Sequence, residues 1–225
     1  IVRTIIITIL SVLTVDQLLK LWVKLTFHYG EKIELIPGWF ELQFVENPGM
    51  AFGWMLPGTT GKIVLSVFRI VVVSGILWYV IRLTKKHVSK LYLICLSLIV
   101  AGALGNIIDS LAYGVMFDKG STFDEHFQDF IGYPGLAQAN GEGYAPMLRG
   151  NVVDMLHFDR EVTWPSWSPI YPGETRELFP PIFNIADSAI TLGILLILLF
   201  QKRIFTEPQD EVVVTEEITP AAQEE

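Results

Sequence analysis

Four long apolar runs alternate along the chain with segments that hold nearly all of its charged residues. The runs extend from about Val2 to Phe27, from Ile63 to Leu83, from Leu91 to about Ile108 and from about Ile185 to Phe200. A helix needs about 20 apolar residues to cross a hydrocarbon layer of about 30 Å, and each run is near that length. The pattern therefore predicts a polytopic membrane protein, all-α in its fold class, with four transmembrane helices.

The first apolar run has the weakly basic start of a cleavable signal peptide, at Arg3. It also carries Asp16 and Lys20, continues past signal-peptide length and has no small-residue cleavage site. We interpret it as a retained membrane helix. A three-span alternative, with this segment lying flat on the membrane, conflicts with its continuous apolarity.

Lysine and arginine residues predict the orientation of the spans. They gather at the N-terminus, in the link between the second and third runs, and directly after the fourth run: Arg3, Arg82, Lys85, Lys86, Lys90, Lys202 and Arg203. The positive-inside rule assigns these positions, and so both termini, to the cytoplasm. Two outer loops then face the other side, at about 28–62 and 109–184.

The polar segments predict smaller features around this helical core. Residues 33–45 are rich in β-formers around a Pro-Gly turn, which predicts a small extracytoplasmic β element. The stretch 115–150 forms an insertion in the long outer loop. We expect one membrane domain over 1–205, followed by an acidic, disordered cytoplasmic tail over 206–225.

Composition excludes several kinds of protein. The formal net charge of −8 argues against a nucleic-acid partner. Cys95 is the only cysteine, so the chain has neither an internal disulfide nor a multi-cysteine metal site. Its place inside an apolar run predicts a buried packing residue.

Four aspartates lie in or beside the predicted spans, where a charge is costly and indicates function. They are Asp16, Asp109, Asp154 and Asp187. The last three each follow an asparagine by three residues: Asn106, Asn151 and Asn184 respectively. On a helix this spacing places both side chains on one face, so that the amide can orient the carboxylate. All three pairs fall at the predicted outer membrane boundary.

Two carboxylates brought together share a proton, because like charges a few ångströms apart are costly to ionise together. One then acts as general base on a water and the other as general acid towards the carbonyl oxygen and the leaving amine. This is aspartic proteolysis, which needs neither a metal nor a cofactor. Its rate is expected to be bell-shaped in pH.

Five ordered blocks of residues together resemble the motifs of the lipoprotein signal peptidase (signal peptidase II) family. They are Asp16-Gln17-Leu18-Leu19-Lys20, Asn47-Pro48-Gly49-Met50-Ala51-Phe52, Gly102-Ala103-Leu104-Gly105-Asn106-Ile107-Ile108-Asp109, Val152-Val153-Asp154-Met155 and Phe183-Asn184-Ile185-Ala186-Asp187-Ser188-Ala189-Ile190. The resemblance implies a four-helix protease of the bacterial inner membrane. It would cut diacylglyceryl-modified prolipoproteins just before the lipidated cysteine, near the extracytoplasmic face.

By motif position, the same resemblance maps the catalytic pair onto Asp154 and Asp187. It also implies inhibition by globomycin. Supporting or substrate-binding roles are expected for the remaining motif residues: Asp16, Lys20, Asn47, Asn106, Asp109 and Asn184. Asp16 and Lys20 are four residues apart and can pair on one helix face. We expect a monomer whose other partners are membrane lipids.

Two features depart from the family pattern. Many members have an arginine directly after the aspartate of the third block, where this chain has Ser110. We hypothesise that Arg149 or Lys119 of the long loop supplies the missing cation. The insertion 115–150 separates the third and fourth blocks further than in shorter members, and its role is open.

Three other classes compete with the protease interpretation. Intramembrane acids also mark ion pathways, but four spans without an evident repeat are atypical of a transporter. His126 and His157 lie among acidic residues, yet the chain has no His-Glu-x-x-His motif of a metalloprotease. A membrane scaffold would account for the tryptophans at interfacial positions, Trp39, Trp54, Trp164 and Trp167. It leaves the paired aspartates unexplained.

Overall fold

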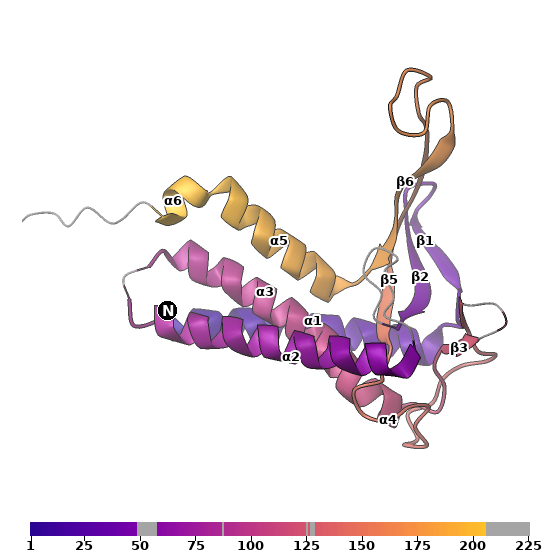
Figure 1. The fold of residues 1–225 in the computed structure, drawn as a ribbon, viewed down its shortest axis with the longest axis horizontal. Helices are drawn as coiled ribbons and strands as arrows, with labels where there is room; N and C mark the ends of the chain where they lie inside the picture. The colour runs from indigo at the N-terminus through magenta and orange to yellow at the C-terminus, as the bar shows by residue number, and fades with distance from the viewer. Residues whose placement is uncertain (49–57, 87, 125, 127–128, 206–225) are drawn as a thin grey trace, which may run out of the picture.

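The long apolar helices lie side by side, and a β-sheet stands across one end of them (Figure 1). This is a computed structural model, which describes residues 1–48, 58–86, 88–124, 126 and 129–205. Trp54, the end of the second motif block and the expected tail 206–225 lie outside the described residues. The N-terminus, the link between α2 and α3 and the end of α5 all lie at the helix ends away from the sheet (Figure 1).

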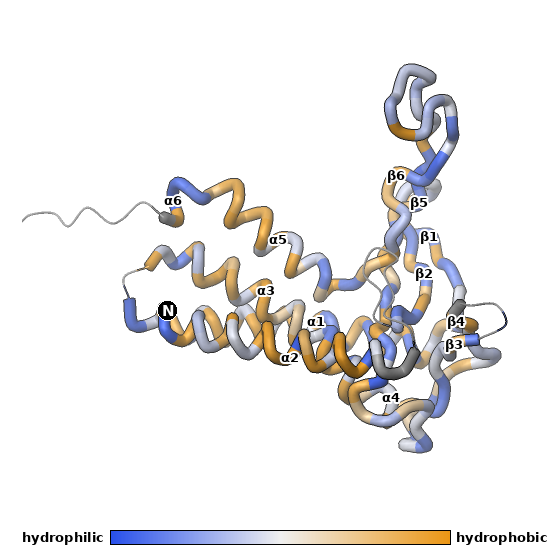
Figure 2. Tube along the Cα trace, in the orientation of Figure 1, coloured by the Kyte–Doolittle hydropathy of each residue, from blue (hydrophilic) through white to orange (hydrophobic). Residues whose placement is uncertain are grey.

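The helices follow the apolar runs closely. They are α1 (Val2–Thr26), α2 (Gly58–Leu83), α3 (Lys90–Ile108) and α5 (Ile185–Leu199), with the short α6 (Gln201–Phe205) at the end. Three are long and apolar enough to cross a membrane, whereas α5 has 15 residues. Their outward side chains are apolar and exposed, as on α2 at Phe68, Val71 and Trp78. Figure 2 shows this apolar character along the helices.

The central helix is α3, which packs against α1, α2 and α5. Small residues allow a close approach between α3 and α5. A Cβ atom at Gly102 would lie 2.1 Å from the Ala186 carbonyl oxygen, and one at Gly193 would lie 2.7 Å from that of Cys95. Cys95 is fully buried in this contact, as its apolar surroundings predict. The packing brings the C-terminal end of α3 against the N-terminal end of α5.

The sheet corrects the expected all-α fold class. It is antiparallel in the order β1 (Lys32–Ile36), β2 (Phe40–Asn47), β5 (Val152–Thr163) and β6 (Thr175–Phe183). The predicted β element of the first outer loop supplies only half of it. The long loop supplies the rest, because the β-branched and aromatic residues of β5 pair with β2 across more than a hundred residues of sequence.

The insertion packs against the C-terminal end of α1 and against the face of the sheet opposite Asp154. After α3 the chain makes a π-helical turn, η1 (Asp109–Tyr113), and a helical turn, α4 (Gly114–Met116), before the hairpin of β3 (Thr122–Asp124) and β4 (Asp129–Ile131). Tyr113, Phe117 and Ala137 share a buried cluster with Val23 of α1 and Met155 of β5. The insertion is therefore part of the frame that holds β5.

Candidate active site

The two predicted catalytic aspartates come from different elements that meet where β6 leads into α5. Asp154 lies on β5, where it pairs with Val45 of β2. Asp187 lies in the first turn of α5, and Asn184 stands directly before that helix. Asp154 is buried and Asp187 half-buried.

Asn184 joins both carboxylates. Its side-chain amide donates to Asp154 Oδ1 at 2.6 Å and to the Val153 carbonyl at 3.3 Å. Its side-chain oxygen accepts from the Asp187 backbone N–H at 2.9 Å, while Asp187 Oδ2 accepts from the Asn184 N–H at 3.3 Å. This reciprocal capping box fixes the start of α5. One asparagine thus holds both aspartates in place.

Asn106 of α3 connects this pair to α1. Its amide nitrogen donates to Asp187 Oδ1 at 2.8 Å, and its oxygen accepts from Lys20 Nζ at 2.9 Å. The same oxygen accepts from the Asn184 amide at 3.2 Å. Because each atom has a partner, the Asn106 side chain has one fixed orientation.

Lys20 forms a buried ion triad with Asp16 and Asp109. Its Nζ lies 3.0 Å from Asp16 Oδ2 and 2.8 Å from Asp109 Oδ2, and all three side chains are at most 1% exposed. Asp16 also accepts from the Ala186 N–H at 2.9 Å, and Asp109 from the Val153 N–H at 3.3 Å. The triad therefore contacts the residues directly before both predicted catalytic aspartates.

Gln17 also belongs to the network, although the sequence assigned it no role. Its amide donates to Asp16 at 3.1 Å and to Asp109 at 2.9 Å. Its oxygen accepts from the Tyr113 hydroxyl at 3.2 Å. Its position directly after the intramembrane Asp16 was the sequence signal that could have indicated this role.

The electrostatics of the pair favour a shared proton. Burial raises the pKa of Asp154 well above its usual range, and the neighbouring charge of Asp187 raises it further. Lys20 and hydrogen bonds from Asn47 and Asn184 oppose that rise in pKa without cancelling it. Asp154 therefore tends to hold a proton, as one member of a carboxylate pair that shares a proton does.

Six predicted supporting residues gather here: Asp16, Lys20, Asn47, Asn106, Asp109 and Asn184. The expected helical pairing of Asn151 with Asp154 is wrong. The two flank the start of an extended strand, so three residues of spacing turn their side chains to opposite faces. Asn151 bonds instead to Glu46 at 2.8 Å and to Ser121, and Asn184 supplies the amide at Asp154.

A cation that sequence reasoning missed lies on α2. Arg69 interacts electrostatically with Asp187, Asp154 and Asp109. Ser66, one turn earlier on the same helix face, donates to the Leu148 carbonyl at 3.0 Å, and Lys62 bonds to Asn151. An arginine within a span was the signal that could have found it.

The loop cations proposed to replace the family arginine have other surroundings. Lys119 donates to the Pro134 carbonyl at 3.1 Å on the surface. Arg149 lies near the positive charge of Lys62. Arg69, by contrast, interacts electrostatically with both Asp154 and Asp187.

The two histidines of the long loop lie apart. His157 bonds to Glu41 at 2.8 Å on the sheet face opposite Asp154, so it does not contact the pair. The His126 N–H donates to Asp124 in the insertion. Across the described part of the chain, no three histidine, cysteine or acidic residues gather as a metal site would require.

Known proteins resemble this chain over most of its length. Residues 8–202 match the family model described as "Signal peptidase (SPase) II". The chain is 44% identical over 197 residues to a lipoprotein signal peptidase of Porphyromonas gingivalis, covering 87% of this chain and 81% of that one. A lipoprotein signal peptidase of Amoebophilus asiaticus is 35% identical over 216 residues, covering 92% and 81%.

A solved structure described as a bacterial membrane enzyme shares the fold. Its TM-score is 0.56 at 24% identity, with 94% of this chain and 96% of that one covered. The family match spans the helices, the sheet and every aspartate of the site. The chain therefore belongs to the signal peptidase II family of lipoprotein signal peptidases, aspartic peptidases of the bacterial membrane that cleave the signal peptides of prolipoproteins.

Proposed function

We propose that Asp154 and Asp187 are the catalytic pair of this peptidase and share one proton. The observation that carries the proposal is their junction through Asn184, which bonds to both residues within a buried network. Burial and the charge of Asp187 raise the pKa of Asp154, which supports Asp154 as the protonated partner.

The chemistry follows from that assignment. Asp187 accepts a proton from a water whose oxygen attacks the scissile carbonyl carbon, and Asp154 donates its proton to the carbonyl oxygen. When the tetrahedral intermediate collapses, Asp154 recovers that proton and Asp187 passes its own to the leaving amine as the C–N bond breaks. The pair is regenerated, and no covalent enzyme intermediate forms.

The substrate is a diacylglyceryl-modified prolipoprotein, cut before its lipidated cysteine. Its acyl chains would lie in the bilayer while the scissile bond reaches the sheet end of the helices, near the extracytoplasmic face. Both termini would be cytoplasmic, since the basic residues cluster at the opposite helix ends. A monomer over 1–205, with 206–225 as a cytoplasmic tail and sensitivity to globomycin, completes the proposal.

The test compares purified wild-type protein with Asp154→Asn and Asp187→Asn on a diacylglyceryl-modified prolipoprotein in detergent. Both isosteric changes are expected to abolish cleavage. Asp159→Asn, on the same strand and partly exposed, is the matched control and should cut at the wild-type rate. Continued cleavage by both variants would show that the pair is misassigned and make Asp109 the next candidate. A substrate without the lipid separates lipid recognition from peptide hydrolysis.

A further inference from the structure

Three polar residues lie on the inward face of α2 near its start. Lys62 and Ser66 both bond to the loop directly before β5, so both side chains point into the protein. Arg69 follows at helical spacing, and Val73, one turn further along, is buried. Residues three or four apart share a helix face. Arg69 therefore points inwards, whereas Phe68 next to it is exposed.

The side chain of Arg69 extends towards the predicted catalytic aspartates. α2 begins at the sheet end of the helices (Figure 1), and helical side chains tilt towards the N-terminus of their own helix. Arg69 consequently extends towards the sheet end, where Asp154 and Asp187 lie. Its electrostatic interactions agree with this direction, since the strongest is with Asp187 and the next are with Asp154 and Asp109.

Arg69 differs from the other buried cation of the site, Lys20. The three N–H groups of Lys20 Nζ have three acceptors, Asp16 at 3.0 Å, Asp109 at 2.8 Å and Asn106 at 2.9 Å, so all of its donors are used. Among the residues that the structure describes, none forms a hydrogen bond or an ion pair with the Arg69 side chain. A guanidinium has five N–H donors in a planar fork. These donors are available to a group that enters the site.

Hydrolysis of the signal peptide creates a new anion at this position. Water adds to the scissile carbonyl carbon, the C–N bond breaks, and the products are a carboxylic acid on the signal peptide and a free amine on the mature protein. The acid loses its proton to the amine, because an α-carboxyl group has a pKa of about 3.3–3.7 and an α-amino group one of about 7.7–8.0. The signal peptide thus ends in a carboxylate beside an aspartate pair that is itself negative when it shares one proton.

We infer that Arg69 binds the C-terminal carboxylate that cleavage leaves on the signal peptide. The inference rests on the proposed catalytic pair, because Asp154 and Asp187 place the scissile carbonyl within reach of Arg69. A guanidinium fork matches a carboxylate through two parallel N–H···O bonds. It also supplies the positive charge that offsets repulsion between the new carboxylate and the pair. A purely structural ion pair would hold one acid within about 4 Å, as Lys20 holds two.

This contact makes the cleaved signal peptide a competitive inhibitor of its own production. The intact substrate has an uncharged amide where the product has a carboxylate, so a charge-assisted bond to Arg69 strengthens only after cleavage. Arg69 then slows the release of the signal peptide, and replacing it frees the site sooner. A residue that only adjusts the protonation of the aspartates would not distinguish a carboxylate from an amide in this way.

Two synthetic signal peptides test the inference. Both end at the residue before the lipidated cysteine and carry an N-terminal fluorophore, and they differ only in having a free carboxylate or a carboxamide at the C-terminus. Fluorescence anisotropy measures the Kd of each for the purified full-length protein in detergent at neutral pH. Wild type should bind the carboxylate at least about ten-fold more tightly, the size of a hydrogen bond to a charged group. Arg69→Gln should bind both peptides equally, with the carboxamide at its wild-type Kd, which also verifies the fold of the variant.

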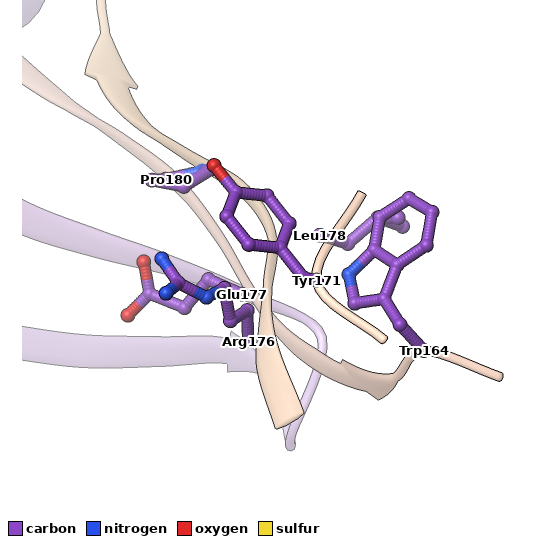
Figure 3. A pocket seen from close by; sticks show the side chains of 6 residues that line it. All are labelled: Trp164, Tyr171, Arg176, Glu177, Leu178 and Pro180. Carbon is purple, nitrogen blue, oxygen red and sulfur yellow. The ribbon is translucent and has the colours of Figure 1, made fainter. Parts of the chain in front are cut away.

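Two further variants complete the comparison. Arg69→Lys should keep part of the preference for the carboxylate, because it keeps the charge but not the fork. Arg176→Gln is the matched control and should discriminate as wild type does. Arg176 lies on the outer hairpin of β5 and β6, where it lines a separate pocket (Figure 3). It has partners of its own there, the Tyr171 ring at 4.0 Å and Glu174 at 2.7 Å.

Equal affinity of the wild-type protein for the two peptides would overturn the inference, and this comparison needs no variant to fold. A preference for the carboxylate that survives in Arg69→Gln would overturn it as well. Peptide binding requires no turnover, so its outcome is separate from that of the cleavage assay. Continued cleavage by Asp154→Asn and Asp187→Asn would contradict the proposed pair, whereas the binding comparison bears on Arg69.

Discussion

Lys24 is buried beneath the insertion, and replacing it should destabilise the packing of the insertion against α1 and β5. Its Nζ bonds to Glu46, to the Lys119 carbonyl at 2.7 Å and to the Tyr133 hydroxyl at 3.1 Å. Three aromatic rings surround it at 5.0–5.2 Å: Phe117, Tyr133 and Tyr144. Neither side chain of the Lys24–Glu46 pair is exposed.

Lys24→Met keeps the apolar stem but leaves Glu46 as an unpaired buried charge. Breaking one side of a buried ion pair costs about 3–5 kcal/mol. Glu46 keeps hydrogen bonds from the Ser121 N–H at 2.7 Å and the Asn151 amide at 2.8 Å, which favours the lower end of that range. The double variant Lys24→Met/Glu46→Gln removes the charge and should recover about half of the loss or more, because the neutral amide keeps an acceptor for Ser121.

The assay is reversible unfolding of the detergent-purified protein, followed by circular dichroism. Lys85→Met, an exposed lysine at the far end of α2, is the control and should change stability by no more than about 0.5 kcal/mol. Glu46 also accepts from the Asn151 amide, and Asn151 directly precedes β5, the strand that carries Asp154. Cleavage by Lys24→Met should therefore also be slower than wild type at a temperature at which the variant remains folded. If Lys24→Met unfolds like the control, the ion pair does not anchor the insertion.

Three further predictions concern the active site. Cleavage should be bell-shaped in pH, because a pair that shares one proton titrates in two steps, and the rate should fall at high pH as Asp154 loses the proton that its raised pKa retains; a rate rising steadily into alkali would contradict the shared proton. The raised pKa also means that stability contributed by protonated Asp154 is present below its unfolded pKa of about 3.9 and lost as pH rises through the folded value. Asp154→Asn should therefore gain stability over wild type as pH increases, which melting curves across pH measure; a constant difference would refute it. Arg69→Gln removes a positive charge that interacts with both aspartates, so the pH profile of cleavage should move to higher pH, while Arg69→Lys should stay near wild type.

The sequence predicts the spans and most residues of the site, because the features that indicate them lie within short stretches of the chain. A span is recognised from consecutive apolar residues, since each must face lipid or the bundle interior. Asp16, Lys20 and Asp109 stand out because a charged side chain in such a run needs a partner, and Lys20 indeed pairs with both acids. The order of the motif blocks then indicated Asp154 and Asp187.

Other features depend on contacts between segments far apart in the chain. The three Asn-x-x-Asp pairs look equivalent as sequence, but their local structures differ: the end of a helix for Asn106, the start of a strand for Asn151 and a helix cap for Asn184. Only the pairing of β5 with β2 decides that Asn151 turns away from Asp154 and that Asn47 bonds to it.

The interactions of Arg69 and the Lys24–Glu46 pair likewise depend on contacts between distant segments. Each joins segments whose proximity exists only once the helices pack and the insertion folds over α1. Local sequence therefore determined which residues must avoid lipid or find partners, whereas the tertiary structure chose the partners, because hydrogen bonds and ion pairs act over a few ångströms of space whatever the separation along the chain.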